Sequence, residues 1–432
     1  MDAIDLLLLA ARPFKTACRV PRDLASVTDV GEEVAPRAAG VTRQAVEGVW
    51  SAAQALYRTG LYPALQICVR RSGRVVLNRA IGHTRGNAPD DPPEGPRETV
   101  GVGTPFLLYS ASKAITAMVI HKLDEQRILH INDRVCEYIP EFAAGGKDRI
   151  TIHHVLGHRA GIPNLPPGAM DLDLLDDPQR VVELLCALRP SFPAGRRLAY
   201  HAVSGGFVLG EVVRRATGRD VREVLRKEIA EPLGLRWLGY GTAPEDAKRV
   251  ARDAVTGLPV RAPFSWAFRR ALGIGFEDAV RLASDPRFLR GVVPSANIVA
   301  TAEEVSAFYQ CLLDDGELGG VRVFEPRTVR RATAEDSYLE LDLTLAVPIR
   351  YGLGFMLGGP VSLFGVRTER AFGHLGFTNI VCWADPDRAL AVAILTSGKP
   401  FLSPDVARLL GLLLAIGRAF PRLRPGRRRS RT

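Results

Sequence analysis

The chain has 432 residues, of which 47% are hydrophobic and 24% are charged, with a mean hydropathy of +0.04. This composition is typical of a globular protein with a large core, and it excludes a collagen-like, low-complexity or mainly disordered chain. The formal net charge is +10, but seven arginines in the last fifteen residues leave only +3 for the rest, so the body of the protein lacks the basic face that nucleic-acid binding requires.

The N-terminal residues and the cysteines bear on the cellular compartment. Asp2 and Asp5 precede a short apolar run, whereas a secretory signal begins with positive charge. No stretch approaches the roughly 20 apolar residues of a membrane-spanning helix. The six cysteines are isolated and form no C-x-x-C pair, which indicates buried thiols in a reducing compartment and no zinc or other metal site. We therefore expect a cytoplasmic protein.

The first half of the chain begins without regular structure. Residues 1–45 are rich in charged and small residues, which predicts an irregular segment. Helical spacing of apolar residues follows over 46–59. Residues 64–69 and 74–78 read as two strands around a turn at Ser72 and Gly73. A strand hairpin therefore follows the first helix.

The remaining elements change from helices to strands and back. Residues 111–126 predict a helix with one apolar stripe, and residues 150–300 carry mostly helical patterns broken by Pro and Gly. After a helix over 302–313, short strands extend from 352 to 396, and a final helix covers about 404–420. With strands at both ends and helices between them, the economical fold is α/β of the α+β kind.

This fold class consists of an antiparallel sheet built from the two ends of the chain, flanked by terminal helices, with an inserted, mostly helical domain. The expected divisions are an irregular segment 1–45, a catalytic unit 46–415 made of a sheet domain (46–125 and 300–415) and a helical domain (about 126–299), and a basic tail 416–432.

The first candidate for chemistry is Ser110-Ala111-Ser112-Lys113. Positions i and i+3 share a helix face, so Lys113 lies over Ser110. A serine hydroxyl becomes a nucleophile when a neighbour takes its proton, and a lysine can do so when burial lowers its pKa. The motif also arises by chance as a helix-capping serine with a surface lysine, but Lys113 lies in an unusually apolar segment.

Two further stretches indicate a functional site only when they are considered together with the first. Tyr200 precedes a glycine-rich helix start, where a core tyrosine is the ordinary interpretation. The stretch from Gly373 to Phe377 reads Gly-His-Leu-Gly-Phe, and its glycines allow close approach of backbone N–H groups to a ligand. His374 alone is as consistent with a structural role as with a functional one.

In order and spacing, the three motifs resemble the serine β-lactamase and penicillin-binding-protein superfamily. The similarity is greatest to class C β-lactamases, D-alanyl-D-alanine carboxypeptidases and family VIII carboxylesterases. It covers about residues 50–415 and includes the segments 150–163 and 193–218. The resemblance implies a β-lactamase/transpeptidase-like fold and a serine hydrolase that needs no cofactor.

The resemblance also assigns roles to single residues. It implies Ser110 as the acyl-accepting nucleophile, with Lys113 and Tyr200 sharing the general-base work. Substrate would be bound by His374, Gly376 and Phe377, with an oxyanion hole formed by the backbone N–H groups of Ser110 and Phe377.

The sequence departs from the β-lactamase pattern at two positions. Where the family has Tyr-x-Asn, this chain has Tyr200-His201-Ala202, and where the family has Lys-Thr-Gly, it has His374-Leu375-Gly376. An amide and a fixed cation are thereby lost, although histidine also occurs at the second position in some family peptidases. Both changes favour a carboxylesterase for small neutral esters.

Several alternatives stay open at this point. A β-lactamase, a D-alanyl-D-alanine carboxypeptidase, an acyltransferase and a non-catalytic binding protein could all use the same fold. Ala202-Val203-Ser204-Gly205-Gly206 approximates the nucleophile elbow of an α/β-hydrolase, but that motif requires a buried strand before it. His153, His154 and His158 have no carboxylate at helical spacing and read as structural.

The expected partner is a small-molecule ester or amide, with no nucleic acid bound by the body. An apolar helix followed directly by arginines is also the pairing that attaches proteins peripherally to membranes. Peripheral membrane contact through the basic tail therefore stands beside a merely solvated tail as an interpretation of residues 416–432.

Overall fold

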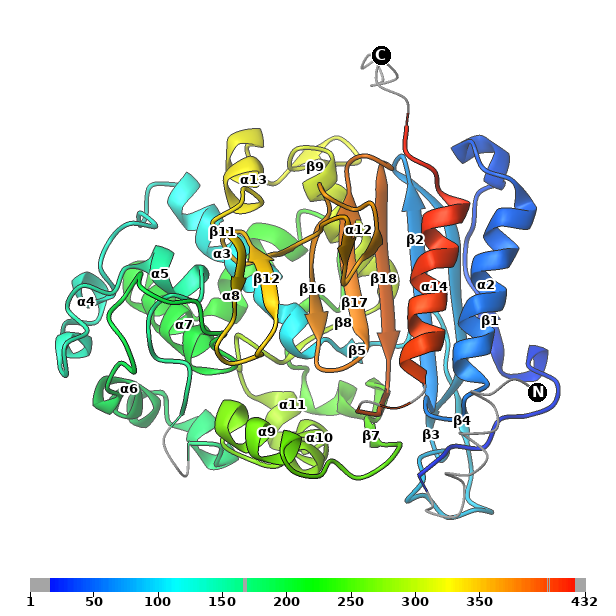
Figure 1. Cartoon of the computed structure of the whole chain (residues 1–432), viewed down its shortest axis with the longest axis horizontal. Helices are drawn as coiled ribbons and strands as arrows, with labels where there is room; N and C mark the ends of the chain where they lie inside the picture. The colour runs from blue at the N-terminus through cyan, green and yellow to red at the C-terminus, as the bar shows by residue number, and fades with distance from the viewer. Residues whose placement is uncertain (1–15, 166–168, 402, 404, 424–432) are drawn as a thin grey trace.

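A ten-stranded antiparallel sheet organises the described part of this computed structural model, which comprises residues 16–165, 169–401, 403 and 405–423 (Figure 1). The two ends of the chain meet where β2 pairs with β18, with Val69 opposite Val392. From one edge to the other the strands are β1 (Thr28–Val30), β3 (Arg74–Arg85), β2 (Ala64–Arg71), β18 (Leu390–Thr396), β17 (Ile380–Asp385), β16 (Phe372–Gly376), β13 (Met356–Leu357), β12 (Pro348–Tyr351) and β11 (Ser337–Leu341), while β4 (Glu98–Thr99) pairs with β3.

Helices cover both faces of the sheet. On one face α2 (Arg43–Tyr57) and α14 (Asp405–Ala419) lie side by side (Figure 1). On the other face α12 (Ala302–Leu313) packs against β2, β17 and β18. Side chains alternate along β2, so that Ile67 joins the core under α2 and α14 whereas Cys68 joins the core on the opposite face. The expected antiparallel sheet with terminal helices is confirmed.

The segment between the two halves of the sheet is mainly helical. Its α-helices are α4 (Val135–Tyr138), α5 (Ile152–Leu156), α6 (Pro178–Ala187), α7 (Ser204–Thr217), α8 (Val221–Leu225), α9 (Phe264–Leu272), α10 (Phe276–Ala283) and α11 (Pro286–Arg290). A π-helical turn over Arg226–Ala230 extends α8, and α13 (Pro326–Ala332) follows α12.

Short strands complete the fold. They are β5 (Phe106–Leu107), β8 (Ile298–Ala300) and β6 (Gly239–Tyr240) in one small sheet, β7 (Ala254–Val255) with β19 (Gly398–Lys399), β9 (Glu317–Leu318) with β10 (Val321–Arg322), and β14 (Val361–Ser362) with β15 (Gly365–Val366).

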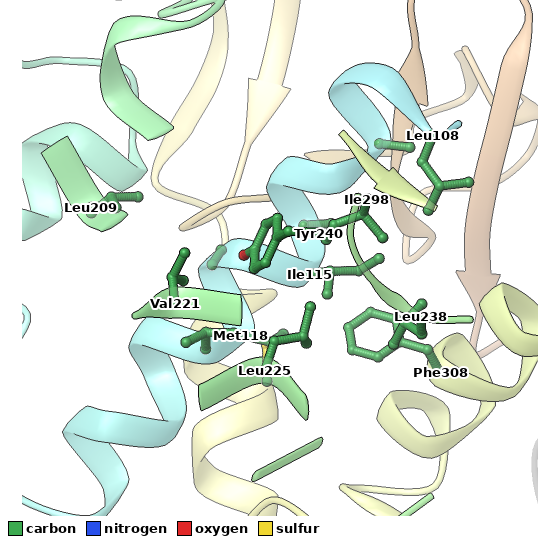
Figure 2. Close-up of a cluster of buried hydrophobic side chains, with 14 of the residues drawn as sticks. Leu108, Ile115, Met118, Leu209, Val221, Leu225, Leu238, Tyr240, Ile298 and Phe308 are labelled. Carbon is green, nitrogen blue, oxygen red and sulfur yellow. The ribbon is translucent and has the colours of Figure 1, made fainter. Parts of the chain in front are cut away.

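Helix α3 (Ser112–Glu125) runs through the centre of the molecule. Every residue from Ser112 to Leu123 except Lys122 is buried, so the helix is covered all round rather than along one stripe. Figure 2 shows Ile115 and Met118 of α3 among Leu225, Tyr240 and Phe308 from three other elements. A side chain on the first turn of α3 is therefore removed from water by its surroundings.

The N-terminal boundary differs from its prediction. Within the segment 1–45 that was expected to be irregular, residues 28–30 form β1 and pair with Arg79–Ile81 of β3. The error has a physical cause: three residues at a sheet edge show no hydrophobic alternation, and their stability comes from β3. Helix α2 also begins at Arg43, where the Thr42 hydroxyl accepts a hydrogen bond from the Ala45 N–H (3.1 Å).

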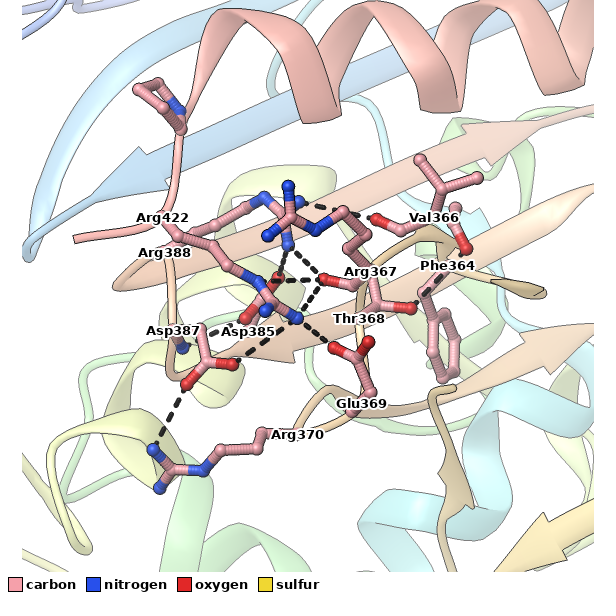
Figure 3. A network of polar contacts seen from close by, with 12 residues as sticks. Phe364, Val366, Arg367, Thr368, Glu369, Arg370, Asp385, Asp387, Arg388 and Arg422 are labelled. Atoms are coloured by element: carbon pink, nitrogen blue, oxygen red, sulfur yellow. Dashed lines mark hydrogen bonds and ion pairs between the residues drawn. The ribbon is translucent and has the colours of Figure 1, made fainter. Parts of the chain in front are cut away.

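Helix α14 (Asp405–Ala419) agrees with the final helix predicted over about 404–420, but it continues past residue 415, so the predicted start of the basic tail at residue 416 lies within the helix. Ile416 and Phe420 are buried at i and i+4 and extend the apolar face of α14. Arg422 then pairs with Glu369 and donates to the Arg367 carbonyl, beside the buried Arg388–Asp385 pair (Figure 3). The part of the predicted tail up to residue 423 is thus bound to the body, and residues 424–432 lie outside the described residues.

Two properties concern the whole described chain. None of its helices is both long and apolar enough to cross a membrane. Cys68, Cys311 and Cys382 are buried as expected, whereas Cys18, Cys136 and Cys186 are only partly buried.

Candidate active site

The candidate nucleophile lies on a tight turn before the central helix. Ser110 belongs to the 3₁₀ turn η4 (Tyr109–Ala111) and is partly exposed, while the residues on either side of it are buried. Tyr109 has a φ of 47°, a left-handed conformation that is costly for a tyrosine. Its ring stacks on Phe377 (5.0 Å between centroids), and the Lys399 ammonium lies 4.8 Å from its centroid. These contacts hold the turn so that the Ser110 hydroxyl reaches the surface of the site.

Lys113 contacts Ser110 as the helical spacing predicts. Its Nζ lies 3.1 Å from the Ser110 Oγ, 2.8 Å from the Ala202 carbonyl oxygen and 3.1 Å from the Ser295 carbonyl oxygen. A neutral amine has two N–H donors and one lone pair. When the two carbonyls accept the two N–H bonds, the lone pair is directed at the Ser110 hydroxyl.

The surroundings of Lys113 also set its charge. Burial lowers the pKa of Lys113 from 10.5 to about 7, because water is excluded. A substantial fraction of the side chain is therefore neutral at physiological pH. The amine has the geometry and the basicity to take a proton from Ser110.

Tyr200 completes the group around the nucleophile. Its ring centroid is 4.8 Å from the Lys113 Nζ and 4.7 Å from the His158 ring, and its backbone N–H donates to Asp342 Oδ1 (3.1 Å). Burial raises the pKa of the Tyr200 phenol, although a hydrogen bond with Ser110 opposes the shift. Tyr200 therefore keeps its proton near neutral pH and is suited to donate a hydrogen bond, while Lys113 is the better base.

Strand β16 brings the third motif to the same place. A Cβ on Gly376 would lie 2.2 Å from the Leu108 carbonyl oxygen, so only glycine allows β16 to approach the residues before the nucleophile turn. Phe377 follows with a φ of 50° and stacks on both Tyr109 and Phe276. The predicted oxyanion-hole donors, the N–H groups of Ser110 and Phe377, therefore belong to neighbouring segments.

His374 is buried beside this group and is electrically neutral. Its Nδ1 contacts the Leu375 carbonyl oxygen (2.7 Å), and its Nε2 is buried without a hydrogen-bond partner among the described residues. Burial, together with the nearby Lys113, lowers the pKa of His374 to about 3. The fixed cation of the β-lactamase pattern is therefore replaced here by a neutral ring.

Several residues of the site escaped the sequence reasoning. Asp342 is fully buried and holds the Tyr200 backbone, yet it stands 142 residues further along the chain. His158 packs on Tyr200, and its Nδ1 accepts from the His201 N–H (3.2 Å). The Ala202 and Ser295 carbonyls carry no residue signature at all. A single aspartate within the leucine-rich run 338–347 was the one available signal.

The alternative nucleophile lacks the features of an elbow. Ser204 opens α7 without a preceding strand, is fully buried, and donates to the Ile162 carbonyl (2.6 Å). The main sheet is antiparallel, whereas the elbow needs a mainly parallel one.

His153 has a partner that spacing in the sequence could not reveal, because its Nε2 lies 2.7 Å from Asp336 Oδ1. Among the described residues, no group of three or more His, Cys, Asp or Glu could hold a metal ion.

Known proteins are similar to this chain over most of its length. "Esterase/beta-lactamase LipL" of Mycobacterium tuberculosis is 32% identical over 330 residues, which cover 72% of this chain and 74% of that protein. A solved penicillin-binding protein homologue from Caulobacter crescentus is 29% identical with a TM-score of 0.72, and a family VIII carboxylesterase is 25% identical with a TM-score of 0.73. Each structure aligns with 87% of this chain and 98% of its own.

The similarity and the geometry around Ser110 agree with each other. The relatives belong to the serine hydrolases, and the sequence profile of the Beta-lactamase family matches residues 46–415, which include all three motifs. The chain is therefore a member of the Beta-lactamase family, within the serine hydrolase superfamily.

Proposed function

We propose that this chain is a carboxylesterase that hydrolyses small neutral esters through an acyl-enzyme on Ser110. The observation that carries the proposal is the contact between the Lys113 amine and the Ser110 hydroxyl, in which two backbone carbonyls orient the amine. A binding protein on the same fold would have no use for a buried amine that contacts the hydroxyl of a partly exposed serine.

The reaction has two halves, acylation and deacylation of Ser110, and Lys113 moves a proton in both. Lys113 takes the hydroxyl proton as the Ser110 Oγ attacks the ester carbonyl carbon, and the N–H groups of Ser110 and Phe377 bind the resulting oxyanion. The C–O bond to the alcohol breaks, and the departing oxygen receives a proton through Lys113 and Tyr200. Water then attacks the acyl carbon and gives a proton to Lys113, the bond between this carbon and the Ser110 Oγ breaks to release the acid, and Lys113 returns the proton to the Ser110 oxygen.

The preference for neutral esters rests on two positions. Ala202 has no amide with which to bind an acylamino group, and neutral His374 offers no fixed charge to an anionic carboxylate. A β-lactam antibiotic carries such a carboxylate. The similarity to a family VIII carboxylesterase supports the same assignment.

The proposal is tested with p-nitrophenyl esters of graded chain length beside a chromogenic cephalosporin. We expect ester turnover and labelling by a fluorophosphonate probe, both abolished in Ser110→Ala and both retained in Ser204→Ala. Cephalosporin turnover comparable to that of short esters would contradict the substrate class. Full activity of Ser110→Ala would contradict the mechanism.

A further inference from the structure

The hairpin formed by the edge strand β11 and its neighbour β12 carries a run of exposed apolar side chains, three on β11 and three in the loop that connects the strands. Between Ser337 and Pro348, six large apolar residues are 37% to 76% exposed. We call this set the apolar hairpin face: Tyr338, Leu339, Leu341, Leu343, Leu345 and Val347. Monomeric soluble proteins seldom expose so many neighbouring apolar side chains unless the surface binds something.

Within residues 337–348, all of which the structure describes, the hairpin has no exposed, unpaired charge. Its two acidic residues are Glu340, which pairs with Arg159, and Asp342, which is fully buried. The Asp342 Oδ1 accepts hydrogen bonds from the N–H groups of Thr344 and Leu345 (2.8 and 2.9 Å). The apolar hairpin face therefore carries no unpaired charge, and its one exposed carboxylate, Glu340, is neutralised by Arg159.

The same hairpin is bonded directly to the candidate active site. The Asp342 Oδ1 that closes the hairpin loop also accepts from the Tyr200 N–H (3.1 Å), and the Leu343 N–H donates to the Leu198 carbonyl (3.0 Å). Figure 1 shows β11 and β12 at the end of the sheet that faces α5 and α7. A surface that binds this hairpin is thus connected, through Asp342 and Leu343, to the segment that carries Tyr200.

A second copy of the chain is a poor occupant of this surface. Strand β11 is the edge of the sheet, but its pairing with β12 shifts register between Ser337 and Glu340, and Leu339 has a φ of 44°. Such a bulge prevents continuous strand pairing with another chain.

A lipid bilayer fits the face better. A bilayer requires no matching backbone ladder, and aliphatic side chains enter its interface with an energy that grows with apolar area. Tyr338 supplies an aromatic side chain of the kind found at the headgroup level, and the Arg350 guanidinium that lies 5.9 Å from its ring centroid is itself paired with Glu335.

From these observations we infer that the apolar hairpin face docks on a lipid bilayer and that the enzyme takes neutral esters dissolved in it. This inference names the substrate class of the proposed esterase and rests on that function. The binding step itself requires no catalysis, so the two proposals can fail separately.

The binding test uses Ser110→Ala protein and sedimentation with phosphatidylcholine vesicles at about 0.1 M and about 1 M NaCl. We expect binding at both salt concentrations, reduced at least tenfold by Leu341→Ser/Leu343→Ser/Leu345→Ser. The matched control is Val361→Ser/Leu363→Ser/Val366→Ser, which alters exposed residues on β14, on β15 and in the turn between them and should bind as before.

Other outcomes overturn the inference. Absence of binding, or equal binding by both triple variants, would exclude the hairpin as the docking surface. Binding only to anionic vesicles that is lost at high salt would indicate the basic tail instead. A dimer in sedimentation velocity that the hairpin variant abolishes would identify a second copy as the occupant.

An activity comparison separates this inference from the proposed function. With Ser110 intact, the hairpin variant should keep its rate on dissolved p-nitrophenyl acetate and lose at least tenfold on p-nitrophenyl decanoate held in vesicles. Loss of both rates in a hairpin variant whose circular dichroism matches that of wild type would show that the hairpin acts in catalysis itself, which contradicts a docking role. If wild type hydrolyses neither ester but binds vesicles, the proposed function fails while the docking surface stands.

Discussion

Two buried lysines flank the turn that carries Ser110, and their surroundings differ in one respect. Lys399 is fully buried and lies 3.3 Å from Asp253 Oδ1 while covering the Tyr109 ring. Lys113 is buried as well, but its acceptors are the Ser110 hydroxyl and two backbone carbonyls. The difference is therefore the presence or absence of a carboxylate.

That difference separates a structural lysine from a basic one. Burial lowers the pKa of both amines, but the Asp253 carboxylate opposes the shift at Lys399, whereas only burial acts on Lys113. A paired ammonium holds the Tyr109 side of the turn in place. An unpaired amine can lose its proton and accept another from Ser110. The chain thus uses one residue type for two purposes by placing a single carboxylate.

Removing each lysine should affect activity very differently. Lys113→Met should lower kcat for p-nitrophenyl acetate by about 10³-fold or more, because general-base catalysis contributes about 10² to 10⁴ and the hydroxyl also loses its orienting contact. Lys399→Met should stay within about tenfold of wild type per folded molecule. Circular dichroism establishes the folded fraction. Equal losses in the two variants would contradict the division of roles.

The loss of Lys399 should instead be seen in the free energy of unfolding. Lys399→Met leaves the Asp253 carboxylate buried without a counter-charge, which should cost about 3–5 kcal/mol of unfolding free energy. Adding Asp253→Asn should restore part of this loss, since the unpaired charge is then gone. Urea denaturation at pH 7 measures both values. If the single variant is as stable as wild type, the Lys399–Asp253 pair has no structural role.

Part of the fold and of the candidate site could be predicted from the sequence. The spacing of Ser110 and Lys113, the hairpin of β2 and β3 and the final helix all follow from local periodicity, which depends on neighbouring residues alone. The apolar segment around Lys113 likewise indicated its burial, because few other charged residues lie near it in the sequence.

The rest depends on contacts between distant residues. The Ala202 and Ser295 carbonyls that orient Lys113 exist at every residue and leave no pattern to detect. Asp253 meets Lys399 across 146 positions, and neither residue belongs to a motif. Strand β1 owes its conformation to β3 rather than to its own three residues.

The charge state of Lys113 should also appear in the pH dependence of stability. The folded-state pKa of about 7 is below the value of roughly 10.4 expected for an unfolded lysine, so the unfolded chain binds more protons between these values. Stability of wild type relative to Lys113→Met should therefore rise by about 2–3 kcal/mol from pH 7 to pH 9. Urea denaturation of both proteins at each pH gives the difference, in which other titrating groups cancel. A constant difference would mean that Lys113 has an ordinary pKa.

The pH dependence of kcat/KM is the smallest expected effect, and it tests most directly whether Lys113 or Tyr200 is the base. If neutral Lys113 accepts the Ser110 proton, kcat/KM for p-nitrophenyl acetate should fall about tenfold per pH unit below an apparent pKa of about 7. Burial raises the pKa of the Tyr200 phenol instead, so a tyrosinate base would place this fall above pH 10. Tyr200→Phe serves as the control: it should lower the rate, because the phenol no longer helps protonate the leaving group, yet keep the acidic limb near pH 7. A limb near pH 10 in wild type that disappears in Tyr200→Phe would transfer the base role to Tyr200. In that case Lys113 would not act as the base, and the absence of a carboxylate beside it would have no role in catalysis.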